Sequence, residues 1–130
     1  MEYSPLVREL FATLPRCGEL TAGPGTTVAG EAMALERGAW VRLEARLEGG
    51  RLVDCAFRAW GCPHTLGAAA IAAERLVGWR VGTPAPVNAH ALAALLAAPA
   101  EKLGRLLVVE DAMQALLQGA SGLQLPVSAH

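Results

Sequence analysis

The sequence lacks long apolar runs and an excess of charge of either sign. Its longest apolar stretches are rich in alanine, are interrupted by charged residues and are too short to cross a bilayer. Lysine and arginine total 11, against 12 aspartates and glutamates, so there is no basic footprint for nucleic acid or for an anionic membrane. We therefore expect neither a nucleic-acid-binding protein nor a membrane protein.

Cysteine is also scarce. The three cysteines are odd in number, irregularly spaced and without a Cys-x-x-Cys pair, which argues against a disulfide framework and a closed structural zinc site. The first residues, 1–5, lack the basic and then apolar order of a signal peptide, so we expect a cytoplasmic protein. Apolar residues make up 53% of the 130, enough for one domain over residues 1–130, with 121–130 expected as a flexible tail.

Alternation of apolar and polar residues predicts a small antiparallel sheet. The expected strands are residues 26–35, interrupted by Gly30, and then 41–47 and 52–60. A two-residue turn at the paired glycines would send apolar side chains of the last strand to the polar face. A three-residue loop over 49–51 instead pairs Ala45 with Cys55 and Leu47 with Val53, and the apolar pattern favours it.

Helical patterns lie on both sides of these strands. They cover 4–14 with Ser4 as its cap, a segment from Pro63 to near Gly78, one after Asn88, and one that carries Leu106 to Leu117 with Gly119 as its C-cap. Strands followed by helices predict an α+β fold, a two-layer sandwich in which helices pack on one face of a three-stranded antiparallel sheet.

Cys62 lies where the last strand ends and an alanine-rich helix begins. Pro63 suits the first helical position, which makes Cys62 the N-cap. The positive end of the helix dipole favours the thiolate, the form that binds metals and attacks electrophiles. His64 is close enough to share a metal or a proton with Cys62. A capping thiol beside a surface imidazole is the plainer interpretation of the same residues.

Five short motifs occur in an order that a known family shares. They are Tyr3-Ser4-Pro5, Leu14-Pro15-Arg16 with Gly18, Ala29-Gly30-Glu31-Ala32-Met33, Phe57-Arg58-Ala59-Trp60-Gly61-Cys62 and Glu110-Asp111-Ala112. In this order the chain resembles the NifU/IscU-type iron–sulfur cluster assembly scaffolds over nearly its whole length. The resemblance implies the same α+β sandwich. It also implies a non-enzymatic protein that takes sulfur from a cysteine desulfurase, builds a [2Fe–2S] cluster on convergent cysteines and passes it to acceptor proteins.

The chain departs from that family at two of its three cysteine positions. The first corresponds to Ala29 and the third to Arg105, so Cys62 alone is retained. The resemblance then implies Cys62 and Glu31 as cofactor-binding residues, and Cys62, Glu31 and His64 as ligands of iron or zinc. One protomer supplies fewer thiolates than a [2Fe–2S] cluster usually needs, which leaves a single metal ion or a cluster shared across a homodimer.

Other residues keep further interpretations open. Cys17 follows the first helix and is a candidate replacement ligand, whereas Cys55 falls on the apolar face of its strand and is expected in the core. Trp40 and Trp60 are expected opposite each other on the outer face of the sheet. The stretch from Ala98 to Lys102 shares only one proline and the lysine with the family's chaperone-recognition segment.

Three functional hypotheses follow. The first is a scaffold-like protein that binds iron or accepts sulfur at Cys62 without holding a cluster alone. The second is a cluster-less regulatory module that docks to a desulfurase or another assembly partner. The third is a thiol enzyme with Cys62 as nucleophile and His64 as base, although residues two apart at a helix start rarely have the required geometry.

Overall fold

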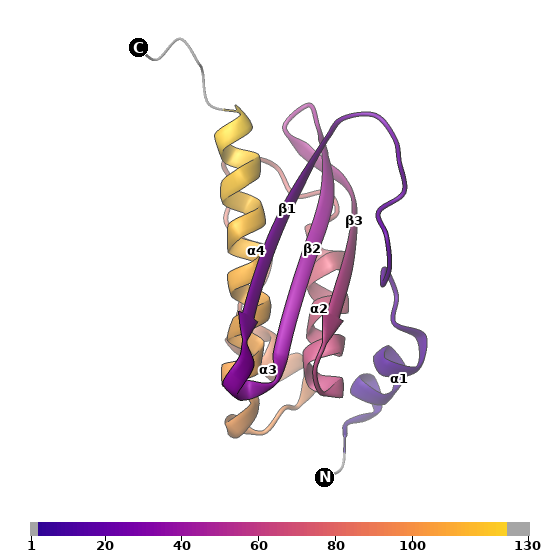
Figure 1. Cartoon of the computed structure of the whole chain (residues 1–130), viewed down its shortest axis with the longest axis vertical. Coiled ribbons are helices and arrows are strands. Elements are labelled where there is room, and N and C mark those ends of the chain that lie inside the picture. The colour runs from indigo at the N-terminus through magenta and orange to yellow at the C-terminus, as the bar shows by residue number, and fades with distance from the viewer. Residues whose placement is uncertain (1–2, 125–130) are drawn as a thin grey trace.

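The computed structural model describes residues 3–124 and has two layers (Figure 1). Its elements are α1 (Pro5–Thr13), β1 (Thr26–Ala34), the 3-10 turn η1 (Leu35–Arg37), β2 (Ala39–Glu48), β3 (Arg51–Trp60), α2 (Pro63–Leu76), α3 (Ala89–Leu96), the 3-10 turn η2 (Ala100–Lys102) and α4 (Leu103–Gln124). The strands form one antiparallel sheet in the order β1-β2-β3, with α2 and α4 against one face. The predicted α+β sandwich is confirmed.

None of the helices within residues 3–124 is both long enough and apolar enough to span a membrane.

The hairpin between β2 and β3 differs from the prediction near its turn. Ala45 lies opposite Cys55 as predicted, but Leu47 lies opposite Leu52 and not Val53. The turn consists of two glycines with φ of 59° and 77°, the left-handed values that a type I′ turn requires. An extra residue in β3 then forms a β-bulge and restores the expected register beyond it.

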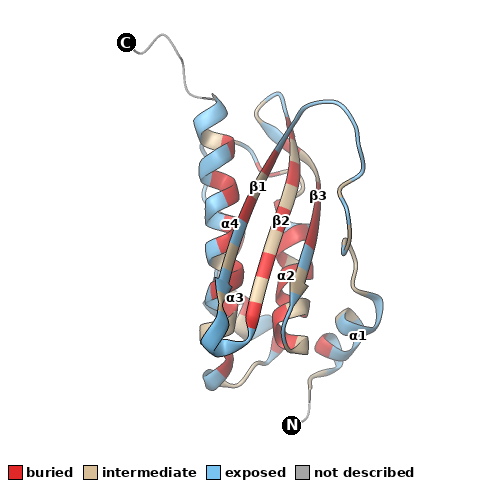
Figure 2. Ribbon diagram, viewed as in Figure 1, coloured by how far each residue is buried: buried red, intermediate tan, exposed pale blue. Residues whose placement is uncertain are grey.

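The core lies between the inner face of the sheet and the helices (Figure 2). The small residues of α2 allow it to pack closely on β3, and Gly30 allows α4 to approach β1. A side chain at Gly30 would collide with the backbone of Ala112 and Leu116, which explains a glycine inside a strand. Among the largest buried side chains are Leu43, Leu52, Phe57, Leu76, Leu92, Leu96, Leu106, Met113 and Leu116.

Most of the predicted helix ends are observed. Ser4 and Asn88 cap α1 and α3, because their side-chain oxygens accept hydrogen bonds from the N–H groups two or three residues into the helix. α4 does not end at Gly119 but continues to Gln124, so residues 121–124 of the expected tail are helical. The rest of that tail, 125–130, lies outside the described residues.

Candidate functional site

Cys62 is the N-cap of α2, as predicted. The chain turns from β3 into the helix at Gly61, whose φ of 151° lies in the region that favours glycine. A side chain at Gly61 would also press on Thr65 and on the carbonyl oxygen of Gly38. The turn that carries the thiol therefore lies directly against the loop between η1 and β2.

The start of α4 joins the same region. Arg105 Nε donates a hydrogen bond of 2.9 Å to the carbonyl oxygen of Arg37. The Arg37 guanidinium in turn covers Gly104, where any side chain would collide with it. Three segments far apart in the sequence thus meet around Cys62: residues 35–38, 61–65 and 102–105.

The surroundings of Cys62 favour its thiolate. Burial raises the pKa of the half-buried thiol, but hydrogen bonding from the backbone and hydroxyl of Thr65 and from the backbone of His64, together with the charge of Lys102, outweighs burial. The pKa of Cys62 is consequently lowered from its ordinary value. Its Sγ lies 3.7 Å from Thr65 Oγ1. Such an N-terminal thiol is a nucleophile and a soft ligand near neutral pH.

His64 is not the surface imidazole of the plainer interpretation. Only 1% of it is exposed, and its ring packs at a tilt on Tyr3 with centroids 4.9 Å apart. Its Nδ1 has no hydrogen-bond partner in the described part of the chain. Burial lowers its pKa, and the positive charges of Lys102 and Arg105 lower it further. The ring is therefore neutral at physiological pH, with one polar atom left unsatisfied.

Lys102 is the only lysine of the chain and is 9% exposed. This fraction describes the whole residue, much of which is an aliphatic stem, and the ammonium nitrogen is not among the buried polar atoms without a partner. Lys102 forms no ion pair with any residue from 3 to 124, and neither does Arg37 or Arg105. We refer to Arg37, Lys102 and Arg105 as the cationic cluster.

The cationic cluster was only partly predicted from the sequence. Arg105 stands at a family cysteine position, where an arginine is expected to favour anions or to pair with Glu31, whereas Arg37 carried no prediction. The structure pairs Glu31 with Arg42 instead. Lys102 was considered only as a remnant of a chaperone-recognition stretch. One signal was available: Lys102 lies one turn before Leu106 and so continues the buried stripe of α4.

Glu31 lies elsewhere. Its carboxylate accepts hydrogen bonds from Trp40 Nε1 at 2.6 Å and from Arg42 at 3.1 Å, on the exposed face of the sheet. The bond from Trp40 and the charge of Arg42 hold the pKa of Glu31 below its usual value despite some desolvation. The carboxylate of Glu31 is therefore already hydrogen-bonded to Trp40 and Arg42.

A metal-binding group is not formed by the predicted ligands. Within residues 3–124, no three histidine, cysteine, aspartate or glutamate side chains lie close enough together to hold a metal ion. Cys62 and His64 are neighbours, but the structure does not bring Glu31 to them. The charged group that acts on the thiol is the cation Lys102, which cannot ligate a metal. These surroundings do not fit a metal ion or an iron–sulfur cluster held by one protomer.

The other two cysteines do not complete the site. Cys17 is exposed and pairs with Phe57 along the edge of β3, well before the strand reaches Cys62. Cys55 is 2% exposed and belongs to the core, as predicted. Burial raises the pKa of the Cys55 thiol to about 12, so it is inert as a nucleophile near neutral pH.

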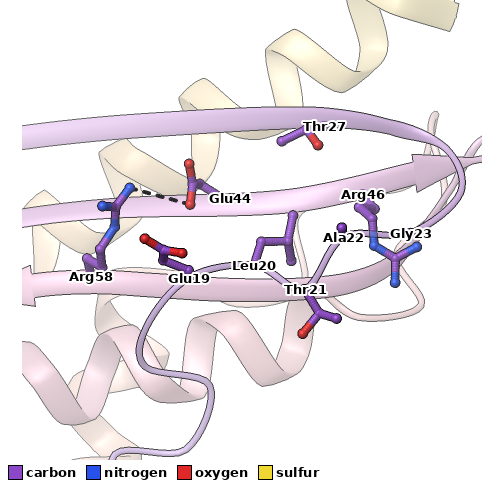
Figure 3. Close-up of a pocket in the computed structure, with 9 residues that line it drawn as sticks. All are labelled: Glu19, Leu20, Thr21, Ala22, Gly23, Thr27, Glu44, Arg46 and Arg58. Atoms are coloured by element: carbon purple, nitrogen blue, oxygen red, sulfur yellow. Dashed lines mark hydrogen bonds and ion pairs between the residues drawn. The ribbon is translucent and has the colours of Figure 1, made fainter.

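A separate hollow of about 440 Å³ lies between the loop 19–23 and the outer face of the sheet (Figure 3). Its cations are already paired: Arg58 contacts Glu44 at 3.5 Å, and Arg46 contacts Asp54 at 3.6 Å. None of its lining residues belongs to the surroundings of Cys62. It is lined by no cysteine or histidine, so Cys62 and the cationic cluster form the candidate site.

Comparison with known proteins gives a consistent result. A model of the NifU-like N-terminal domain family matches residues 2–120. The fold is similar to that of a candidate iron–sulfur cluster assembly scaffold of the SUF system from Fervidobacterium islandicum AW-1, with 15% identity and a TM-score of 0.66 over 88% of this chain and 96% of that one. The N-terminal part of a NifU-like protein from Brucella abortus gives 14% identity and a TM-score of 0.64, over 94% and 95%. No curated protein sequence matches the chain.

Proposed function

Because this chain belongs to the NifU-like N-terminal domain family, we propose that it takes part in iron–sulfur cluster assembly as a sulfur carrier, with sulfur held as a persulfide on Cys62. The proposal rests above all on one observation: the thiol with a lowered pKa is influenced by the positive charge of Lys102, and within residues 3–124 no group of metal ligands forms around it. A persulfide is anionic near neutral pH, so the surroundings that favour the thiolate also favour the product.

The chemical step needs no oxidant. The Cys62 thiolate attacks the outer sulfur of a donor persulfide, the donor's sulfur–sulfur bond breaks, and the donor thiolate leaves. A cysteine desulfurase is the donor that the family resemblance implies, and an iron–sulfur assembly protein is the acceptor.

The test is to incubate the protein with a purified cysteine desulfurase and cysteine, and in parallel with free cysteine persulfide, and then to locate the added sulfur by peptide mass spectrometry. We expect one additional sulfur atom on Cys62 and none after Cys62→Ser. Cys17→Ser is the matched control, because Cys17 is an exposed thiol that lies beside Phe57 and away from the cationic cluster. Equal labelling of Cys17, or none on Cys62 with either donor, would contradict the proposal.

A second experiment on the same protein distinguishes a sulfur carrier from a scaffold that holds a cluster. After anaerobic incubation with iron and sulfide, we expect no visible absorption bands of thiolate-bound iron that depend on Cys62. A stable chromophore lost in Cys62→Ser would favour a cluster, shared across a homodimer, and would overturn the carrier role.

A second candidate function, docking without chemistry, is favoured by the outer face of the sheet near Cys62. Met33, Trp40 and Trp60 lie in register across the three strands, and Met33 and Trp60 are exposed. Such a row suits a partner surface for a desulfurase. Retention of desulfurase binding by a protein that never accepts sulfur would support this candidate over the carrier.

A further inference from the structure

The cationic cluster differs from the other cations of the described residues in the burial of Lys102. Among residues 3–124, four arginines form six ion pairs with carboxylates, and the arginines that form none outside the cluster are all exposed. At the Cys62 end, Lys102 is nine-tenths buried without a carboxylate among the described residues. A cation paired with a carboxylate is accounted for by folding alone. A largely covered lysine that forms no ion pair within residues 3–124 and lies near a nucleophile suits an anionic ligand.

His64 provides a second and independent sign of a ligand. It lies in the first turn of α2, two residues after the thiol, and its buried Nδ1 has no hydrogen-bond partner within residues 3–124. A buried polar atom without a hydrogen bond costs free energy in the absence of a ligand. With its proton on Nδ1, the neutral ring would donate to an oxygen of an anion held between Cys62 and Lys102.

We infer that this site accepts sulfur from a small dianionic sulfane-sulfur donor of the thiosulfate type, with the reacting sulfur at Cys62 and the oxygens facing Lys102, Arg105 and His64. The inference rests on the proposed persulfide at Cys62 and specifies a class of donor for it. Thiosulfate carries two negative charges, shared between its terminal sulfur and its oxygens, and the oxygens accept hydrogen bonds. This matches a lysine and an arginine that form no ion pair with a carboxylate within residues 3–124.

The proposed step balances without a further redox reagent. The Cys62 thiolate attacks the terminal sulfur of thiosulfate, the sulfur–sulfur bond breaks, and sulfite leaves with the electron pair of that bond. Cys62 then carries a persulfide. Negative charge moves toward the sulfite oxygens as the bond breaks, so the cationic cluster would stabilise the leaving group. Cyanide can remove the outer sulfur as thiocyanate and return the thiolate.

The experiment measures thiocyanate formation from thiosulfate and cyanide, together with the mass of Cys62 after thiosulfate alone. We expect turnover that is lost in Cys62→Ser and retained in Cys17→Ser. Lys102→Met keeps the apolar stem of the side chain and removes its charge, and should lower turnover at low thiosulfate by about tenfold, mainly through a higher KM. Sulfate should compete with thiosulfate.

Arg75→Gln is the matched charge control. Arg75 is an exposed residue in the last turn of α2, and its loss should leave turnover unchanged. Arg105→Gln serves as a second test of the cluster if Lys102→Met does not fold. Equal effects of Arg75→Gln and Lys102→Met would show that general charge, and not the cluster, recognises the donor, and would overturn the inference.

The outcomes separate this inference from the proposed function. If cysteine persulfide or the desulfurase adds sulfur to Cys62 but thiosulfate does not, the donor class is wrong and the carrier role stands. If thiosulfate binds and competes with sulfate without transferring sulfur, the site is an anion site only and the inference fails. If no donor modifies Cys62, both proposals fail.

Discussion

Cys55 and Cys62 lie on the same strand-to-helix segment in opposite electrostatic surroundings. Next to Cys55, Arg16 contacts Asp54 at 3.1 Å and Glu74 at 2.9 Å, so its charge is balanced, and burial raises the thiol pKa to about 12. Next to Cys62, the cations have no carboxylate among residues 3–124, and the thiol pKa is lowered. Burial dominates the pKa of Cys55, whereas at Cys62 the hydrogen bonds from Thr65 and His64, with a smaller contribution from the charge of Lys102, outweigh burial.

The largest expected effect concerns Cys55 at alkaline pH. Below about pH 9 the thiol is neutral in both folded and unfolded chains and does not affect stability. Above that pH the unfolded thiol ionises while the folded one does not, so stability falls by up to about 4 kcal/mol as the pH approaches 12. Chemical denaturation at several pH values measures this loss, which Cys55→Ala should largely remove. An identical alkaline loss in Cys55→Ala would assign it to other groups.

Arg16→Gln removes the ion pairs next to Cys55. The substitution removes two ion pairs and a hydrogen bond of 3.3 Å to the carbonyl oxygen of Cys55. We expect the free energy of unfolding to fall by about 1–2 kcal/mol, because these contacts are only partly exposed. The reaction of Cys62 with iodoacetamide should not change. A slower reaction at Cys62 would mean that the two regions are electrostatically coupled.

Lys102→Met should have the opposite pair of effects: stability is kept, and the reactivity of Cys62 falls. Lys102 is largely covered and forms no ion pair within residues 3–124, so loss of its charge should leave the free energy of unfolding unchanged or raise it by about 1 kcal/mol. The rate of Cys62 alkylation at pH 7 should fall by about 3–10-fold, because the charge that favours the thiolate is gone. Denaturation and alkylation kinetics are measured on the same preparation, with Arg75→Gln as control. A large loss of stability would indicate that Lys102 is paired.

Gly104→Ala gives the smallest expected effect. A Cβ at this position would displace the Arg37 guanidinium, which is the flexible end of a side chain and can move at little cost. We expect alkylation of Cys62 to slow by about twofold, with stability changed by less than about 0.5 kcal/mol. An unchanged rate, with the mutant folded, would remove Arg37 from the cationic cluster.

Much of the fold could be predicted because its signals are local. Asn88 and Cys62 mark helix starts through backbone chemistry that a few residues define, and the alternation in β2 and β3 fixes which side chains are buried. The bulge at Val53 was not predicted, because a longer turn and a bulged strand preserve the same apolar face. The extension of α4 beyond Gly119 was missed because an exposed glycine need not end a helix that is packed along its length.

The site could be predicted only in part. Cys62 was identified from its place before Pro63, a local feature. Glu31 was expected near it, but its side chain extends from the open face of the sheet, where Arg42 and Trp40 hold it. Whether a carboxylate reaches a thiol from a distant segment depends on strand order and face, which a single sequence does not specify.

The amino-acid sequence by itself determined the order of strands and helices, the family and the thiol at the start of α2, since each depends on residues adjacent in the chain. Only the tertiary structure decided that Lys102 lies near that thiol, that Arg37 and Arg105 contact each other at the start of α4, and that Glu31 is held by Trp40 and Arg42. The physical reason is that burial and charge pairing arise between segments far apart in sequence, whose approach is set by the packing of the whole core.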